Sequence, residues 1–151
     1  MKDIVLKITG KTLSTIPKPP EGMEEEPMEF ITEGKLSKRG TVTRISYDET
    51  PLSGMEGCKT SLIIRPGKVL MKRVGEDKES ETVMQFEKGK RHVGVYDTPY
   101  GPISMEVLAD RISDFEQVGD NKNRMSIEYA ISLRGLMESR KQIDIEVVDK
   151  N

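Results

Sequence analysis

Arg73 is the residue of this sequence with the clearest chemical potential, because apolar side chains share its side of the chain. If residues 68–74 form a strand, alternation places Arg73 on the same face as Val69 and Met71. A guanidinium on an apolar face must be paired, extend to an end of the sheet or bind an anion. Two interpretations follow for Arg73: a structural salt bridge or hydrogen-bond network, and a group that fixes a ligand in a small cavity.

Three tyrosines on other expected strands, Tyr47, Tyr96 and Tyr129, could reach the same interior as Arg73. A phenol supplies apolar area and a hydroxyl that needs a partner when it is buried. Tyr129 lies in the middle of a run, 125–133, with an apolar side chain at every odd position. We expect one or more of these tyrosines to orient a ligand together with Arg73.

His92 is the one histidine of the sequence and Cys58 the one cysteine, so the sequence predicts no metal site and no cofactor. Alternation places His92 and Tyr96 on one face of their strand, and Val93 and Val95 on the other. If the valine face is the buried one, His92 points to solvent. A proton-transfer role would require a carboxylate within hydrogen-bond reach. His92 is kept as a candidate ligand contact.

Two further groups of polar residues match a chemical site only in part. The segment 54–60 contains Gly-Cys-Lys-Thr where a phosphate-binding loop requires Gly-Lys-Thr, and a strand follows where a helix should begin. The carboxylates Glu33, Asp48, Glu49 and Glu56 cluster around two expected loops, and paired carboxylates can hydrolyse glycosidic bonds. Because the sequence has 26 acidic residues, we expect these four to form a solvated rim.

The alternation at 125–133 recurs along most of the sequence and predicts antiparallel β-strands. The strand runs are separated by turn signals at the roughly 8–12-residue spacing of sandwiches and barrels. Ser-Asp-Phe-Glu at 113–116 matches a capping box, so one helical turn could form there, although Gly119 would end it at once. Closely spaced hairpins favour pairing of successive strands, and closure removes exposed edges. We therefore expect an all-β fold, a closed antiparallel up-and-down β-barrel of about 8–10 strands, in preference to a sandwich.

The sequence predicts a single domain, residues 1–151. Its first strand is expected at about 3–12. A flexible loop at about 15–27 is rich in proline and glutamate, which cannot continue a sheet. A solvated connection is the favoured role of this loop, and a lid over the mouth of the barrel is the alternative.

Composition argues against several classes of partner. The 24 basic and 26 acidic residues give a net charge of −2, so the basic excess typical of nucleic-acid-binding proteins is missing. No stretch approaches the roughly 18 consecutive apolar residues of a membrane-spanning helix. Residues 1–10 alternate, unlike the apolar core of a signal peptide, and one cysteine cannot form an internal disulfide. We expect a cytoplasmic protein with no nucleic-acid or membrane partner; the sequence leaves its oligomeric state open.

Several short motifs occur in an order that resembles a known family. They are Phe-Ile-Thr-Glu-Gly at 30–34, Ile-Ser-Tyr-Asp-Glu at 45–49, Gly-Met-Glu-Gly at 54–57, Lys-Arg-Val-Gly at 72–75, Tyr-Asp-Thr-Pro-Tyr-Gly at 96–101 and Ile-Glu-Tyr at 127–129. Together they resemble the YwiB-like family of bacterial proteins, a domain-of-unknown-function family, over nearly the whole chain. The resemblance implies a closed β-barrel of the lipocalin-like (calycin) type in a cytosolic bacterial protein. It implies no established activity and no catalytic residues.

Two functions from different classes fit these observations. The first is non-catalytic binding of a small, partly apolar ligand in or at the mouth of the barrel. The alternative is a structural or protein-interaction module whose barrel is filled by side chains and holds no ligand. An enzyme has the least support, because no group of residues above pairs a nucleophile with a base. A cavity large enough for a ligand would separate the first function from the second.

Overall fold

The computed structural model describes residues 1–18, 27–49, 57–76, 81–98, 101–133 and 137–150, and for residues 96–98 it describes the backbone alone. The described residues form β-strands and contain no helix, so no helix among them could span a membrane. The strands are β1 (Lys2–Ile16), β2 (Met28–Arg39), β3 (Val42–Asp48), β4 (Lys59–Arg65), β5 (Lys68–Val74), β6 (Glu81–Glu87), β7 (Arg91–Thr98), β8 (Gly101–Ile112), β9 (Glu116–Gly119), β10 (Lys122–Leu133) and β11 (Met137–Asp149).

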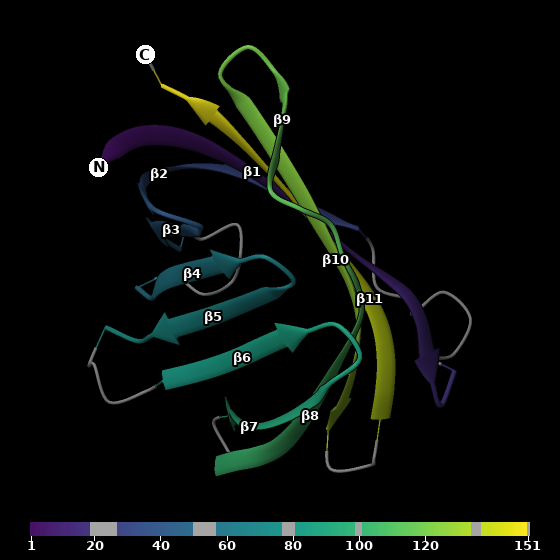
Figure 1. Ribbon diagram of the computed structural model, residues 1–151. Coiled ribbons are helices and arrows are strands. Elements are labelled where there is room, and N and C mark those ends of the chain that lie inside the picture. The colour runs from purple at the N-terminus through teal and green to yellow at the C-terminus, as the bar shows by residue number, and fades with distance from the viewer. Residues whose placement is uncertain (19–26, 50–56, 77–80, 99–100, 134–136, 151) are drawn as a thin grey trace.

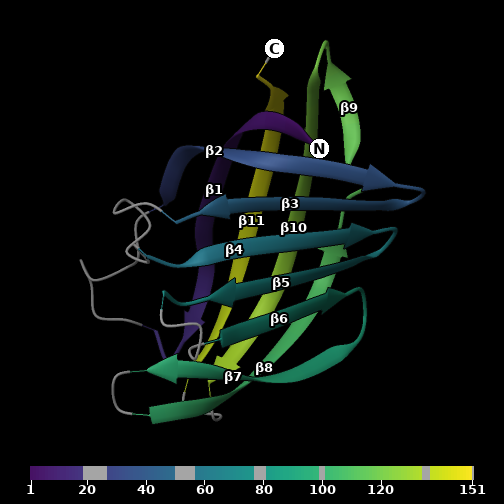
Figure 2. The ribbon, with the colours of Figure 1, turned by 90° about the vertical axis from the view of Figure 1, so that its left-hand side faces the viewer.

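The strands form one antiparallel sheet that curls into a nearly closed barrel (Figure 1). Their order is β6-β5-β4-β3-β2-β1-β11-β10-β8-β7, and β9 pairs with β10. In Figure 2, strands β2 to β7 cross in front of the long, steep strands β1, β11, β10 and β8. The prediction of an all-β, antiparallel, up-and-down barrel is therefore confirmed, with ten strands along the path of the sheet. The finer likeness to lipocalins stays a prediction.

The two ends of the sheet, β6 and β7, meet at a junction that we call the β6–β7 seam. A tight turn through Gly89, which has a φ of 77°, joins the two strands. Glu87 and Lys90 form an isolated bridge there, and the Lys90 amide donates to the Glu87 carbonyl at 2.9 Å. No longer ladder joins β6 to β7 in the part of the chain that the structure describes. The barrel is thus closed less completely at this seam than between the other strands.

The core lies between the two crossing layers and contains the inward-facing residues of each strand. In β10, Met125, Ile127 and Tyr129 are buried, as the alternation at 125–133 predicts. Met125 pairs with Ile145 of β11, which is also buried. Each fully buried side chain of this size contributes about 1.5–3 kcal/mol relative to an exposed one. The alternating pattern therefore both selects the strand conformation and supplies the core.

The helical turn that the capping box at 113–116 allows does not form. The hydroxyl of Ser113 accepts a hydrogen bond from the Ser126 amide at 2.7 Å, and the Ser113 amide donates to the Ser126 carbonyl at 2.9 Å. The group that would cap a helix therefore binds β10 instead. Glu116 begins β9, which also pairs with β10. Pairing with a neighbouring strand satisfies more backbone groups here than one helical turn would.

Strand β1 is longer than the predicted 3–12. Its ladder with β11 changes register between Thr12 and Ser14, at a β-bulge, and then continues until Ile16 pairs with Glu138. Of the loop predicted at about 15–27, residues 15 and 16 thus belong to β1. Residues 19–26 lie outside the described residues.

Candidate ligand-binding site

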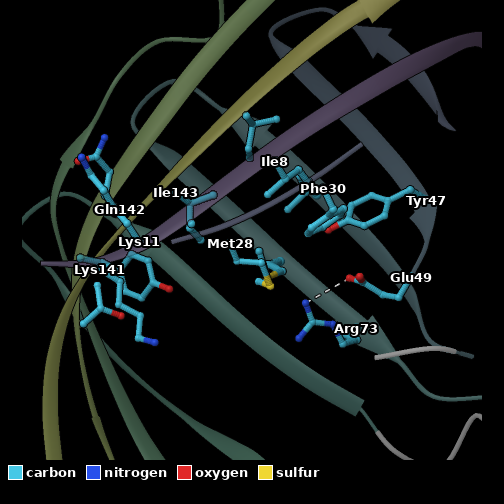
Figure 3. A pocket seen from close by; sticks show the side chains of 16 residues that line it. Ile8, Lys11, Met28, Phe30, Tyr47, Glu49, Arg73, Lys141, Gln142 and Ile143 are labelled. Carbon is cyan, nitrogen blue, oxygen red and sulfur yellow. Dashed lines mark hydrogen bonds and ion pairs between the residues drawn. The ribbon is translucent and has the colours of Figure 1, made fainter. Parts of the chain in front are cut away.

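A cavity of about 260 Å³ lies inside the barrel (Figure 3). Strands β1 to β5, β10 and β11 contribute to its lining, so segments far apart in the sequence meet there. The walls are mostly apolar and consist of Ile8, Met28, Phe30, Leu62, Met71, Tyr129, Ile143 and Ile145. Polar groups are gathered at its two ends.

The register of three strands builds one polar end of the cavity. Tyr47 of β3 pairs with Thr60 of β4, and Thr60 pairs with Arg73 of β5. Partners in adjacent antiparallel strands point to the same face, so these three side chains form a row across the sheet. Glu49 lies two residues beyond Tyr47, on that same face. Its amide donates to the carbonyl of Cys58 at 2.9 Å, which extends the β3–β4 ladder to this residue.

Glu49, Thr60 and Arg73 are hydrogen-bonded to one another, and we call them the Glu49 cluster. Thr60 Oγ1 donates to Glu49 Oε1 at 2.6 Å, and Arg73 Nη2 donates to the same oxygen at 3.3 Å. Arg73 Nε donates to Thr60 Oγ1 at 3.3 Å. The side chain of Glu49 is 1% exposed and that of Arg73 is 22% exposed. Figure 3 shows the guanidinium facing the carboxylate beside the cavity.

The second carboxylate oxygen of Glu49, Oε2, is buried and accepts no hydrogen bond from the described residues. Thr60 and Arg73 both donate to Oε1, and the Tyr47 phenol, which also interacts with the Glu49 carboxylate, makes no hydrogen bond of normal geometry to Oε2. A buried acceptor without a donor costs about 1–3 kcal/mol, and more when it is charged. Because Glu49 lines the cavity, the cluster carries an open acceptor beside it.

Tyr47 is buried and supplies an aromatic side chain to the same end of the cavity as the Glu49 cluster. Its ring is tilted against that of Phe30, with the centroids 6.3 Å apart. Burial raises the pKa of the Tyr47 phenol far above its usual value, and the negative charge of Glu49 raises it further, although Arg73 lowers it in part. Tyr47 is therefore a neutral phenol at physiological pH and does not act as a base.

The opposite end of the cavity is formed by Lys11, Lys141 and Gln142. Lys11 of β1 pairs with Gln142 of β11, and Lys141 follows one position along the same ladder. In Figure 3 these three side chains lie together and away from the Glu49 cluster. Lys11 is exposed to solvent. The cavity therefore extends from an exposed basic end to a buried carboxylate.

Comparison with known proteins assigns the fold and the family. A family model described as "Domain of unknown function (DUF1934)" matches residues 14–145. The chain belongs to the DUF1934 family. The "Crystal structure of ywiB protein from Bacillus subtilis" aligns with a TM-score of 0.76 at 20% identity, covering 99% of this chain and 93% of that chain. No curated protein matches this chain.

These findings confirm the resemblance to the YwiB-like family that the ordered motifs indicate. At 20% identity, the likeness to the solved structure shows the shared barrel and nothing about a ligand. The family description assigns no activity.

Of the five candidate residues from the sequence, the DUF1934 barrel places Arg73, Tyr47 and Tyr129 at the cavity. Tyr129 is buried, and its ring packs edge-on against that of Phe86 with the centroids 4.9 Å apart. The side chain of Tyr96 lies outside the described residues, so its role stays a prediction.

His92 lies at the β6–β7 seam and does not line the cavity. His92 would point to solvent only if the valine face of its strand were buried. Val93 and Val95 are instead 70% and 50% exposed. His92 pairs instead with the buried Val107 of β8, so its face of β7 is the inner one. Its Nε2 lies 3.6 Å from Oε1 of Glu87.

The described residues offer no group of three histidine, cysteine, aspartate or glutamate side chains that could hold a metal ion. The pair of His92 and Glu87 supplies one imidazole and one carboxylate. Protein zinc sites use three or four protein ligands, which this pair alone does not provide.

The expectation of a solvated rim of carboxylates is wrong for Glu49. Glu33 and Asp48 are exposed, as expected, and Glu56 lies outside the described residues. Glu49 is buried because it continues the inward row of β3 that includes Tyr47. A signal for this was available, since Glu49 and Tyr47 share parity along an alternating strand.

Proposed function

We propose that this chain binds a small, partly apolar ligand in the cavity of the barrel, without catalysis. The open Oε2 of Glu49 is the observation that carries the proposal, because buried polar groups of a purely structural ion pair are normally satisfied. Apolar walls with a few converging polar groups are typical of small-molecule sites. The Glu49 cluster would fix the orientation of the ligand, and the walls would supply most of the contact area.

The cavity volume supports a ligand of modest size. About 260 Å³ corresponds to roughly nine water molecules at about 30 Å³ each. Sites for drug-sized ligands occupy about 300–1,000 Å³, slightly more than is available here. A molecule with a single ring and one polar group suits these dimensions.

The positions of the polar groups favour binding over catalysis. Glu49 and Arg73 are engaged with each other and with Thr60. Tyr47 holds its proton, and His92 does not line the cavity. The Thr60 hydroxyl does reach the Glu49 carboxylate at 2.6 Å, but Thr60 is fully buried and does not line the cavity, so it is not placed to attack a ligand there.

A structural or protein-interaction module is the alternative, and one observation at the β6–β7 seam favours it. Val93 and Val95 are exposed on the outer face of β7, at an end of the sheet. Edge strands are where an extended partner segment can add to a sheet. Under this alternative the Glu49 cluster only closes one part of the barrel.

Native mass spectrometry of freshly purified protein tests the proposal. Met71→Trp fills the cavity from β5, whereas Val93→Trp adds the same side chain on an exposed face of β7. We expect the mass of a bound small molecule on the wild-type protein and on Val93→Trp, and its loss from Met71→Trp. Circular dichroism shows whether both variants keep the strand fold. No bound mass on the wild type, with no hit in a fragment screen by NMR, would favour the structural alternative.

We further propose that the chain is a lipocalin-like bacterial protein of the cytoplasm with no nucleic-acid or membrane partner. The up-and-down strand order supports the lipocalin-like description, and the Bacillus subtilis neighbour supports a bacterial source. A single cysteine and a net charge of −2 support the compartment and the absence of nucleic acid. Fractionation of cells that express the tagged protein tests the location directly.

A further inference from the structure

We propose, on the basis of the binding function above, that the ligand carries a neutral amide, with an N–H donor beside a C=O acceptor, on an apolar ring. Two neighbouring groups at the buried end of the cavity require this pattern. Glu49 Oε2 lacks a donor, and Arg73 retains N–H groups that are not used within the cluster. A primary carboxamide or a lactam can contact both groups at once.

Glu49 supplies the acceptor. Its Oε1 accepts hydrogen bonds from Thr60 and Arg73, so the carboxylate is held in one orientation by two donors. This arrangement fixes Oε2 as well, because the two oxygens are parts of one planar group. A ligand N–H placed against Oε2 would satisfy an acceptor that otherwise costs free energy while it is buried.

Arg73 supplies the complementary donor. Of the five N–H groups of a guanidinium, Nε–H donates to Thr60 and one N–H of Nη2 donates to Glu49. The side chain lines the cavity and keeps part of its surface accessible. The 3.3 Å contact between Nη2 and Oε1 places the guanidinium beside the carboxylate that carries Oε2. A primary carboxamide and a lactam present N–H and C=O in the same direction, as this geometry needs, whereas a trans secondary amide does not.

The charges of the cluster select a neutral group. A carboxylate ligand would attract Arg73 but would bring its negative charge against Oε2 of Glu49. An ammonium ligand would attract Glu49 but would be repelled by Arg73 at similarly short range. An amide makes both contacts and adds no net charge to a site that is largely shielded from water.

The walls of the cavity favour a flat apolar body for the ligand. Phe30 and Tyr129 supply aromatic surface, and Met28 and Met71 supply flexible thioether side chains that adapt to a ring and contact it favourably. Benzamide, with one ring and one primary carboxamide, therefore represents the proposed class. Acetophenone, benzoate and benzylammonium share its ring and approximate size but change the polar group.

Protein-observed NMR titration at neutral pH with these four probes tests the inference. The methyl resonances of Met28 and Met71 report binding in the cavity. We expect benzamide to bind at least about tenfold more tightly than acetophenone, which lacks the donor for a charged acceptor. Benzoate and benzylammonium should both bind more weakly than benzamide.

Glu49→Gln provides the matched variant, because it can replace the acceptor Oε2 with an NH₂ donor of the same shape. The advantage of benzamide over acetophenone should disappear in Glu49→Gln and persist in Glu33→Gln, where the carboxylate is exposed. If Glu49→Gln does not fold, the ranking of the four probes on the wild type decides. Equal binding of benzamide and acetophenone would overturn the amide inference and leave the binding function intact. No shift of the cavity methyls with any probe at millimolar concentration would overturn both.

Discussion

Glu49 and Glu87 each lie beside a basic side chain, and these two carboxylates differ in how the sheet surrounds them. At the Glu49 cluster, complete ladders join β3, β4 and β5, and the Glu49 side chain is 1% exposed. At the β6–β7 seam, one isolated bridge joins the strands, and the side chains of Glu87 and His92 are 23% and 26% exposed. The ladders fix the Glu49 cluster in one geometry, whereas parts of the Glu87 and His92 side chains at the seam reach solvent, although Nε2 of His92 is itself buried.

The partners of Glu87 show what the difference in exposure does. Lys90 contacts its carboxylate at 2.8 Å, and Lys68 and His92 approach to 3.7 Å and 3.6 Å. The hydrogen bond from Lys90 lowers the pKa of Glu87, and no single geometry is imposed by these partners. Glu49 instead has two partners on adjacent strands. A position for ligand recognition therefore depends on register and burial more than on the types of charged residue present.

The largest expected effect on stability comes from removing the arginine of a buried ion pair, compared with removing the arginine of an exposed one. Arg73→Met leaves Glu49 buried beside Thr60 and the Tyr47 phenol without a positive charge, and we expect a loss of about 3 kcal/mol in the free energy of unfolding. Arg91→Met in β7 breaks an exposed pair with Glu106 and should cost less than about 1 kcal/mol. The exposed pair is the shorter one, 2.8 Å against 3.3 Å. Urea unfolding of both variants measures the difference.

This pair of variants separates burial from distance. If contact distance decided the energy, Arg91→Met would be the more damaging change. Similar losses from both variants would show that water reaches Glu49 in the folded protein, so that burial would not set its ion pair apart from an exposed one. Unchanged m-values are needed for the comparison, because they show that both variants unfold as the wild type does.

Two glycines provide a smaller test of rigidity in the same two regions. A Cβ at Gly34, which pairs with Tyr47, would lie 2.7 Å from the carbonyl oxygen of Ser46. A Cβ at Gly94 would lie 3.1 Å from the carbonyl oxygen of Val83 across the seam. We expect Gly34→Ala to cost about 2 kcal/mol, in the range of overpacked cores. Gly94→Ala should cost less, because β6 is not held to β7 by a full ladder and can move by a few tenths of an ångström.

Thermal unfolding of the two alanine variants distinguishes these expectations. Gly34→Ala should lower Tm clearly more than Gly94→Ala. Equal decreases in Tm would show that the seam is as rigid as the ladders around β2. That result would remove the physical basis for calling the Glu49 cluster the better positioned of the two regions.

The strand fold can be predicted from the sequence for two reasons. Apolar and polar residues alternate with the two-residue period of a strand, and short hairpin turns place successive strands next to each other. The run from Met125 to Leu133 predicts the inward face of β10: Met125, Ile127 and Tyr129 are buried, and Ile131 and Leu133 are partly buried against the core. The capping box at 113–116 does not produce a helical turn, because the Ser113 hydroxyl binds the amide of Ser126 on a strand that is distant in the sequence. The incomplete pairing at the seam also depends on how the whole sheet curls, which no short segment encodes.

The candidate site was predictable in part for the same reason. Arg73 could be placed on an apolar face from its own strand, whereas Glu49 was assigned to solvent from its charge and its position beside a loop. The burial of Thr60 depends on pairing with both Tyr47 and Arg73, and thus on the register of three strands. The orientation of His92 depends on the buried face of the partner strand β8. Predicting these features would require knowledge of which strands pair and in which register.

The smallest effect is expected at high pH, where only the buried region contains a tyrosine with a strongly raised pKa among the described groups. Burial raises the pKa of Tyr47, so the folded protein keeps the phenol proton after the unfolded chain loses it, near pH 10. This contribution to stability is complete below about pH 10 and is lost as the pH rises toward the raised pKa, with a slope of up to about 1.4 kcal/mol per pH unit.

The variant Tyr47→Phe lacks this titration. The stability difference between wild type and Tyr47→Phe should therefore shift by about 1 kcal/mol, to the disadvantage of the wild type, between pH 9.5 and 11, as measured by urea unfolding. Parallel stability curves over that range would mean that water reaches the phenol, and hence that the end of the cavity beside Glu49 is as open as the seam.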